Sequence, residues 1–153
     1  MDKVLSHSAE ILKKGSKSFS GASKLLDKNT RKSATLLYSW CRYCDDKIDN
    51  QFLGFNKKNN KKKVNAEEIL ISIEKKTQDA INNIPMEQIE FEALRRVLLE
   101  HSIPEQYPIE HLQGFRMDVE NKKYHSIKDT LEYCYHVAGV VGLMMAYIFG
   151  IKD

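Results

Sequence analysis

Apolar residues recur at helical spacing along almost the whole chain, and the alternation typical of strands is absent. No Asn-Gly or Asp-Gly pair stands between two alternating runs, as a β-hairpin would require. The pattern predicts an all-α fold of about six helices, over residues 3–14, 30–50, 66–83, 86–100, 108–121 and 127–149. Prolines fall at the breaks between these ranges, where a missing N–H costs least. A length of 153 residues fits a single domain over residues 1–153.

The last predicted helix begins at a capping box, with Ser126 as N-cap and Asp129 three positions on. Its stretch Val137 to Phe149 carries no charge but is shorter than the ~20 residues that span a bilayer, so we expect a buried core helix. Glycine inside a helix costs about 1 kcal/mol relative to alanine. Gly139 and Gly142 therefore indicate close approach of another helix or of a flat apolar ligand, and the pattern does not choose between them.

Composition places the chain among globular proteins, because 42% of the residues are hydrophobic and 29% are charged. The net charge of +3 is too small to indicate nucleic acid. Much of the basic excess lies in a lysine- and asparagine-rich stretch at 54–65, which we interpret as a flexible insertion. It has no interleaved aromatic residues to stack on bases, so no nucleic-acid partner is expected.

The three cysteines cannot all pair, and no apolar targeting run follows the N-terminal methionine, so we expect a reducing, cytoplasmic setting. Cys41 and Cys44 form a C-x-x-C pair that Cys134 and His136 could complete as a zinc site. The pair lies inside a helical run without a second C-x-x-C, which favours buried structural thiols.

An acidic cluster closes the second predicted helix. Asp45 and Asp49 are one turn apart on one face, where like charges repel, and they lie near the helix C-terminus, where the macrodipole disfavours anions. A divalent cation removes both penalties, and Mg2+ prefers such oxygen ligands. The competing interpretation is a solvated helix end neutralised by Arg42 and Lys47.

The position of the cluster favours the metal hypothesis. Tyr38 and Arg42 continue the acidic face toward the N-terminus, next to an apolar stripe. A polar stripe that borders the core lines a cavity more readily than open water. Tyr38 would offer a hydroxyl there, and Arg42 would pair with a diphosphate or a carboxylate.

The segment from Gly15 to Gly21 supplies three serine hydroxyls and a lysine, which suit a phosphate. It lacks the spacing of a Walker loop, which argues against a nucleotide hydrolase. Taken alone, such a stretch is also typical of an ordinary loop.

Three segments together resemble the squalene/phytoene synthase family. Ser16-Lys17-Ser18-Phe19-Ser20 is similar to its diphosphate-binding S-x-S-F-x element, and residues 38–49 are similar to its Y-x-x-C-R-x-x-D-D-x-x-D motif. Residues 133–142 are similar to its Y-C-x-x-V-A-G-x-V-G signature, and residues 114–120 resemble the phytoene synthase branch.

The resemblance implies an isoprenoid-synthase-type helical bundle around a deep cavity, and head-to-head condensation of two allylic diphosphates. Mg2+ on Asp45 and Asp49 would draw diphosphate from one substrate, and the second substrate would attack the allylic cation to give a cyclopropyl intermediate. The catalytic residues it implies are Tyr133, Tyr38 and Arg42. The substrate-binding residues it implies are Ser16, Ser18, Phe19, Arg42, Asp118, Val137, Ala138, Val141 and Gly142.

The family carries a second aspartate motif, N-x-x-R-D-x-x-x-D, that this sequence does not contain. We therefore expect an N-terminal half of the fold, incomplete as a catalyst alone, with a second polypeptide completing it. The alternative is a non-catalytic helical partner of the same family. Geranylgeranyl diphosphate to phytoene is favoured over farnesyl diphosphate to a squalene-type product, and the oily product implies peripheral membrane contact.

Overall fold

The computed structural model describes residues 2–52 and 60–151, with side chains over 2–49 and 66–151, and all regular structure in this part is helical. The predicted all-α fold class is confirmed. The helices are α1 (Lys3–Gly15), α2 (Lys17–Ser23), α3 (Lys28–Phe52), α4 (Asn60–Ile81), α5 (Ile89–His101), α6 (Gln106–Val119), α7 (Ile127–Cys134), a π-helical turn η1 (Tyr135–Gly139) and α8 (Val140–Ile148).

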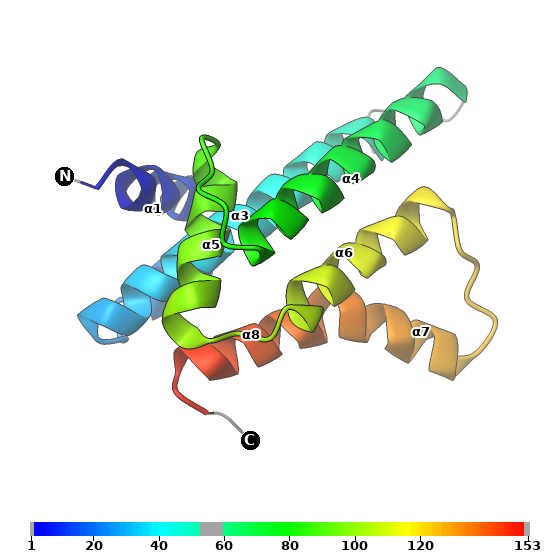
Figure 1. The fold of residues 1–153 in the computed structure, drawn as a ribbon. Helices are drawn as coiled ribbons and strands as arrows, with labels where there is room; N and C mark the ends of the chain where they lie inside the picture. The colour runs from blue at the N-terminus through cyan, green and yellow to red at the C-terminus, as the bar shows by residue number, and fades with distance from the viewer. Residues whose placement is uncertain (1, 53–59, 152–153) are drawn as a thin grey trace.

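The long helices α3 and α4 run side by side in opposite directions and form the spine of the molecule (Figure 1). Helix α1 packs along α3, α5 crosses the spine, and α6 lies against α4. The core between these helices is built around Trp40 and Phe91, both fully buried. The apolar stripe predicted on α3 is confirmed, since Leu37, Cys44 and Ile48 are also buried.

Each predicted helix overlaps an observed one, but α2 was missed. Its sequence, KSFSGAS, is short and rich in serine, so it carries no clear apolar period. Helix α4 begins at Asn60 rather than at residue 66. Of the predicted flexible insertion at 54–65, residues 60–65 belong to α4, and residues 54–59 lie outside the described part.

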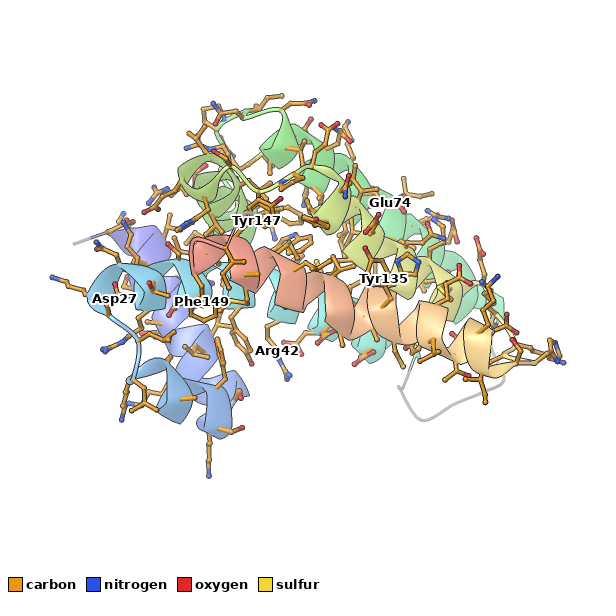
Figure 2. The ribbon with its side chains drawn as sticks, turned by 90° about the horizontal axis from the view of Figure 1, so that it is seen from below. Asp27, Arg42, Glu74, Tyr135, Tyr147 and Phe149 are labelled. Atoms are coloured by element: carbon orange, nitrogen blue, oxygen red, sulfur yellow. The ribbon has the colours of Figure 1, made fainter. Side chains whose placement is uncertain are left out.

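The prediction of a buried last helix is wrong. Residues 127–148 form one continuous rod through α7, η1 and α8, of which only Val140, Met144 and Ile148 are buried. The rod contacts α6, α3 and α5 on one side, and its other side lies uncovered across the molecule (Figure 2). Ile127 is 81% and Leu131 62% exposed. By length and composition alone this rod is apolar enough to cross a membrane.

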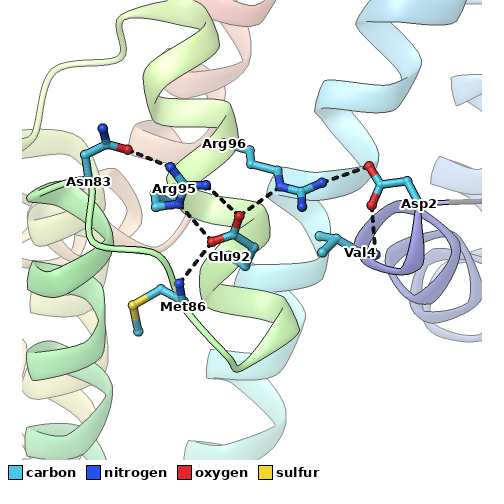
Figure 3. A network of polar contacts seen from close by, with 7 residues as sticks. All are labelled: Asp2, Val4, Asn83, Met86, Glu92, Arg95 and Arg96. Carbon is cyan, nitrogen blue, oxygen red and sulfur yellow. Dashed lines mark hydrogen bonds and ion pairs between the residues drawn. The ribbon is translucent and has the colours of Figure 1, made fainter.

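A buried carboxylate ties the N-terminus, the α4–α5 connection and α5 together (Figure 3). Glu92 accepts hydrogen bonds from the guanidinium of Arg95 at 2.6 and 2.8 Å, from Arg96 at 3.0 Å and from the backbone N–H of Met86 at 3.1 Å. Arg96 also donates to Asp2 at 2.8 Å. The hydrogen bonds from Arg95 are the main reason that the pKa of Glu92 falls to about 2.

Glu92→Gln is expected to lower the free energy of unfolding by about 2 kcal/mol at neutral pH, because two guanidinium groups lose a buried partner. A carboxyl whose pKa is depressed stabilises the fold above its unfolded pKa. The difference from wild type should therefore shrink as the pH falls from about 4.5 toward about 2. Urea unfolding at several pH values measures it. Glu100→Gln, at an exposed position on the same helix, is the control and should cost less than about 0.5 kcal/mol.

Candidate active site

Helix α3 places the predicted metal ligands on the side of the molecule that faces α6 and α7. The side chains of Asp45 and Asp49 keep access to solvent. The surrounding protein nevertheless desolvates Asp45, and this effect, with the neighbouring charge of Asp49, raises its pKa to about 6. Arg42 offsets part of this rise. An ionised Asp45 is therefore costly in the absence of a cation.

A third carboxylate and a tyrosine join this cluster from the following helices. Asp118, near the end of α6, accepts a hydrogen bond from the hydroxyl of Tyr133 on α7 at 3.1 Å. Burial and the charge of Asp49 raise the pKa of Asp118, while the hydrogen bond from Tyr133 lowers it. Burial and then the charge of Asp118 raise the pKa of Tyr133. We refer to Asp45, Asp49, Asp118 and Tyr133 as the acidic cluster.

An apolar cavity of about 270 Å³ lies one helical turn from the cluster. The ring of Phe19 on α2 stacks on that of Tyr38 on α3, with 5.5 Å between their centroids. Burial raises the pKa of the Tyr38 hydroxyl. Burial and then the negative charge of Asp45 raise the pKa of the Cys41 thiol in the cavity wall. The lining residues are Phe19, Ala34, Leu37, Tyr38, Cys41, Val141 and Met145.

Several predicted substrate residues lie elsewhere. Val137 packs against Gly114 on α6 rather than in this cavity, and Ala138 and Gly142 are exposed. No other group lies within 4 Å of where a Cβ on Gly142 would stand, so this glycine serves no close helix contact among the described residues. Of the two alternatives predicted for Gly142, close approach of another helix is therefore not found among the described residues, and approach of an apolar ligand stays a prediction.

The three predicted phosphate ligands lie in different surroundings, and none of them lines the apolar cavity. The Ser16 hydroxyl caps α2 by accepting from the Phe19 N–H at 3.1 Å, and Ser18 is exposed. Arg42 forms an ion pair with Asp46 at 3.1 Å instead of with the two predicted metal ligands. It points outward between α2 and the last helix (Figure 2).

The zinc hypothesis finds no support in the described residues. Cys44 is buried in the core and Cys134 is exposed on α7, so the four candidate ligands do not gather. In the same part of the chain, no three His, Cys, Asp or Glu side chains lie close enough to hold a metal by themselves. A cation at the acidic cluster would need further ligands from water or substrate.

Sequence reasoning gave no role to Gly15 and Gly114, and of the cavity lining it missed Ala34 and Met145. A Cβ on Gly15 would stand 2.5 Å from the Tyr38 hydroxyl oxygen, so this glycine leaves room for the tyrosine. Ala34 lies three residues before Leu37, a helical spacing that could have extended the predicted apolar stripe of α3 to it.

The sequence model of squalene/phytoene synthase matches residues 12–153. The chain belongs to the squalene/phytoene synthase family. It is 47% identical over 150 residues to 15-cis-phytoene synthase of Pantoea ananas, covering 98% of this chain and 48% of that protein. It is 50% identical over 139 residues to 15-cis-phytoene synthase of Enterobacter agglomerans, covering 91% of this chain and 46% of that protein.

Among solved structures, a dehydrosqualene synthase in complex with ligand superposes with a TM-score of 0.79 at 30% identity, over 95% of this chain and 47% of that one. Squalene synthase HpnC from Alicyclobacillus acidocaldarius superposes with a TM-score of 0.78 at 20% identity, over 98% of this chain and 52% of that one, and shows the fold alone. The family is one of transferases. This chain spans about half the length of the relatives it matches.

Asp45→Asn is expected to stabilise the metal-free protein at about pH 7.5, because it removes a partly desolvated negative charge. A carboxyl whose pKa is raised destabilises the fold once it ionises, so the gain in Tm should vanish as the pH falls from about 6 to about 3.8. Thermal unfolding in a chelator at several pH values measures it. Asp79→Asn on α4, outside the acidic cluster, is the control and should change Tm little. An equal or lower Tm for Asp45→Asn at about pH 7.5 contradicts the expectation.

Proposed function

We propose that this chain is the N-terminal half of a head-to-head prenyltransferase. The complete active site would join two molecules of geranylgeranyl diphosphate to give phytoene, or two of farnesyl diphosphate to give a squalene-type product. The observation that carries the proposal is the acidic cluster one turn from an apolar cavity. Carboxylates suit a metal–diphosphate group, and the cavity suits an isoprenoid chain.

The cluster fits Mg2+, which usually binds one or two protein carboxylates and completes its shell with water and substrate phosphates. Asp45 and Asp49 would hold it, since Asp45 already bears the cost of a nearby like charge. Bound there, Mg2+ would neutralise the diphosphate as it leaves. Binding would replace the repulsion between the carboxylates by attraction to the cation.

Other residues of the chain would position the substrate. Ser18 is exposed and free to meet a phosphate oxygen, and Ser16 lies two residues before it. In the described part of the chain, Arg42 forms an ion pair with the exposed Asp46, so its guanidinium can turn to the diphosphate at small cost. Tyr133 would set its ring and hydroxyl beside positive charge that develops on the isoprenoid carbons, while Asp118 orients the hydroxyl.

Calorimetry with non-hydrolysable farnesyl and geranylgeranyl thiodiphosphates tests this proposal. Wild type should bind either ligand only with Mg2+, and Asp45→Ala or Asp49→Ala should weaken binding at least tenfold, or about 1.4 kcal/mol. Asp79→Ala is the control and should bind as wild type does. Binding that ignores both Mg2+ and Asp45→Ala contradicts the proposal.

A second candidate, a subunit that works only with a partner polypeptide, is favoured by the uncovered side of the α7–η1–α8 rod. Leu131, Leu143 and Phe149 expose 62%, 37% and 51% of their surface there. The squalene/phytoene synthases that match contain as much chain again as this one spans. We propose that helices supplied by that other half cover this side, in the cytoplasm, with peripheral membrane contact for release of the oily product.

Co-expression with the C-terminal half of the Pantoea ananas phytoene synthase tests the partner. A stable complex that turns geranylgeranyl diphosphate into phytoene is expected, and Leu131→Lys should weaken the complex at least tenfold. Leu99→Lys, at a leucine 61% exposed on α5, is the control. Binding of the same variants to anionic lipid vesicles is measured alongside, because a membrane is the other surface that could cover Leu131. Chains that bind vesicles through Leu131 but never the second half overturn the partner proposal.

A further inference from the structure

The last helix widens into a π-turn in the middle of the family signature. The backbone N–H of Val140 donates to the carbonyl of Tyr135, five residues back. In an α-helix the same N–H would donate to the carbonyl of His136, four residues back. Such turns break the regular ladder and are frequent at functional sites. The His136 carbonyl that the turn releases needs another donor.

The buried imidazole of His111 on α6 supplies that donor. Its Nδ1 lies 3.1 Å from the His136 carbonyl oxygen, and since a carbonyl only accepts, we infer that Nδ1 carries the proton. His111 is 4% exposed, and its ring is held between those of Trp40 and Phe115, at centroid distances of 5.4 and 5.2 Å. Burial lowers the pKa of His111, which keeps the imidazole neutral.

Two more contacts fasten the π-turn to α6. The Nδ1 of His136 lies 2.9 Å from the carbonyl oxygen of Glu110, so each helix donates to the other. Gly114 lets the backbones approach, because a Cβ there would stand 2.8 Å from Val137 Cγ1 and 3.3 Å from His136 Cβ. The π-turn therefore packs against α6 through two hydrogen bonds and the close approach at Gly114, and the His111 hydrogen bond is the central contact.

The turn decides which way the residues on either side of it point. Positions four apart in an α-helix drift by ~40°, so Tyr133, Val137 and Val141 would spread over ~80°. A π-turn holds more residues per turn and removes part of this drift. Tyr133 accordingly reaches Asp118, Val137 meets Gly114, and Val141 enters the apolar cavity.

We propose that His111 is a positioning residue: its hydrogen bond to the His136 carbonyl holds the π-turn and thereby aims Tyr133 at Asp118 and Val141 into the cavity. The link to catalysis rests on the proposed function. The claim that His111 holds the π-turn does not rest on the proposed function, so the two claims can fail separately.

His111→Asn and His111→Gln form the matched pair that tests it. Asparagine carries an amide nitrogen as far from Cβ as Nδ1, whereas glutamine carries it as far out as Nε2. Through-hydrogen-bond NMR couplings show whether the Val140 nitrogen bonds the carbonyl of Tyr135 or that of His136. NMR contacts between the Tyr133 ring and Asp118 show whether Tyr133 still points at Asp118. The affinity for geranylgeranyl thiodiphosphate in the presence of Mg2+ is measured for each variant.

His111→Asn should keep the Val140–Tyr135 coupling and bind within about threefold of wild type. His111→Gln should shift the coupling to His136, lose the Tyr133–Asp118 contact and bind about tenfold more weakly. Should His111→Gln not fold, His111→Phe keeps a ring beside Trp40 and Phe115 but has no donor, and it should give the same shift and the same loss.

The proposal is overturned if a folded His111→Gln or His111→Phe keeps the Val140–Tyr135 coupling, or if the coupling shifts while Tyr133 stays on Asp118. If wild type does not bind the thiodiphosphate, the proposed function fails, and the couplings and the Tyr133 contact still decide the role of His111.

Discussion

The constraint on which the rest of this structure depends is electrostatic. Helix α3 carries Asp45 and Asp49 one turn apart near its C-terminal end, where desolvation and mutual repulsion raise the pKa of Asp45 to about 6. Asp118 on α6 adds a third negative charge to the same field. A fold held only by its own contacts gains nothing from this arrangement. In the proposed function, a cation that arrives with a diphosphate would turn the same charges into a binding site.

The remaining helices hold this cluster in place from outside it. The Glu92 network ties α5 to the N-terminus, and α5 packs across α3 on the side of Phe91 and Trp40. Helix α6 carries Asp118 at one end and seats the π-turn through His111 and Gly114 along its length. The rod that follows presents one side to this assembly and leaves the other uncovered.

The sequence predicted what local rules control. The apolar stripe on α3, the cap of α7 at Ser126 and the neighbourhood of Asp45 and Asp49 follow from helical spacing and charge. Helix α2 was not predicted because its serine- and glycine-rich sequence shows no helical period of apolar residues. The run from Val137 to Phe149 was wrongly expected to be buried, because an absence of charge shows that no face is made for water but does not say what covers it.

The π-turn and its packing against α6 could not have been predicted either. His111 and His136 are 25 residues apart, and their contact depends on how α6 meets the last helix.

The most direct test of the central claim is the titration of the Asp45 carboxyl carbon by NMR, with and without Mg2+ and inorganic diphosphate. The account predicts a pKa near 6 for the free protein and a fall to well below 4 when the cation and anion are bound. An Asp45 that titrates near 3.8 under both conditions would contradict it.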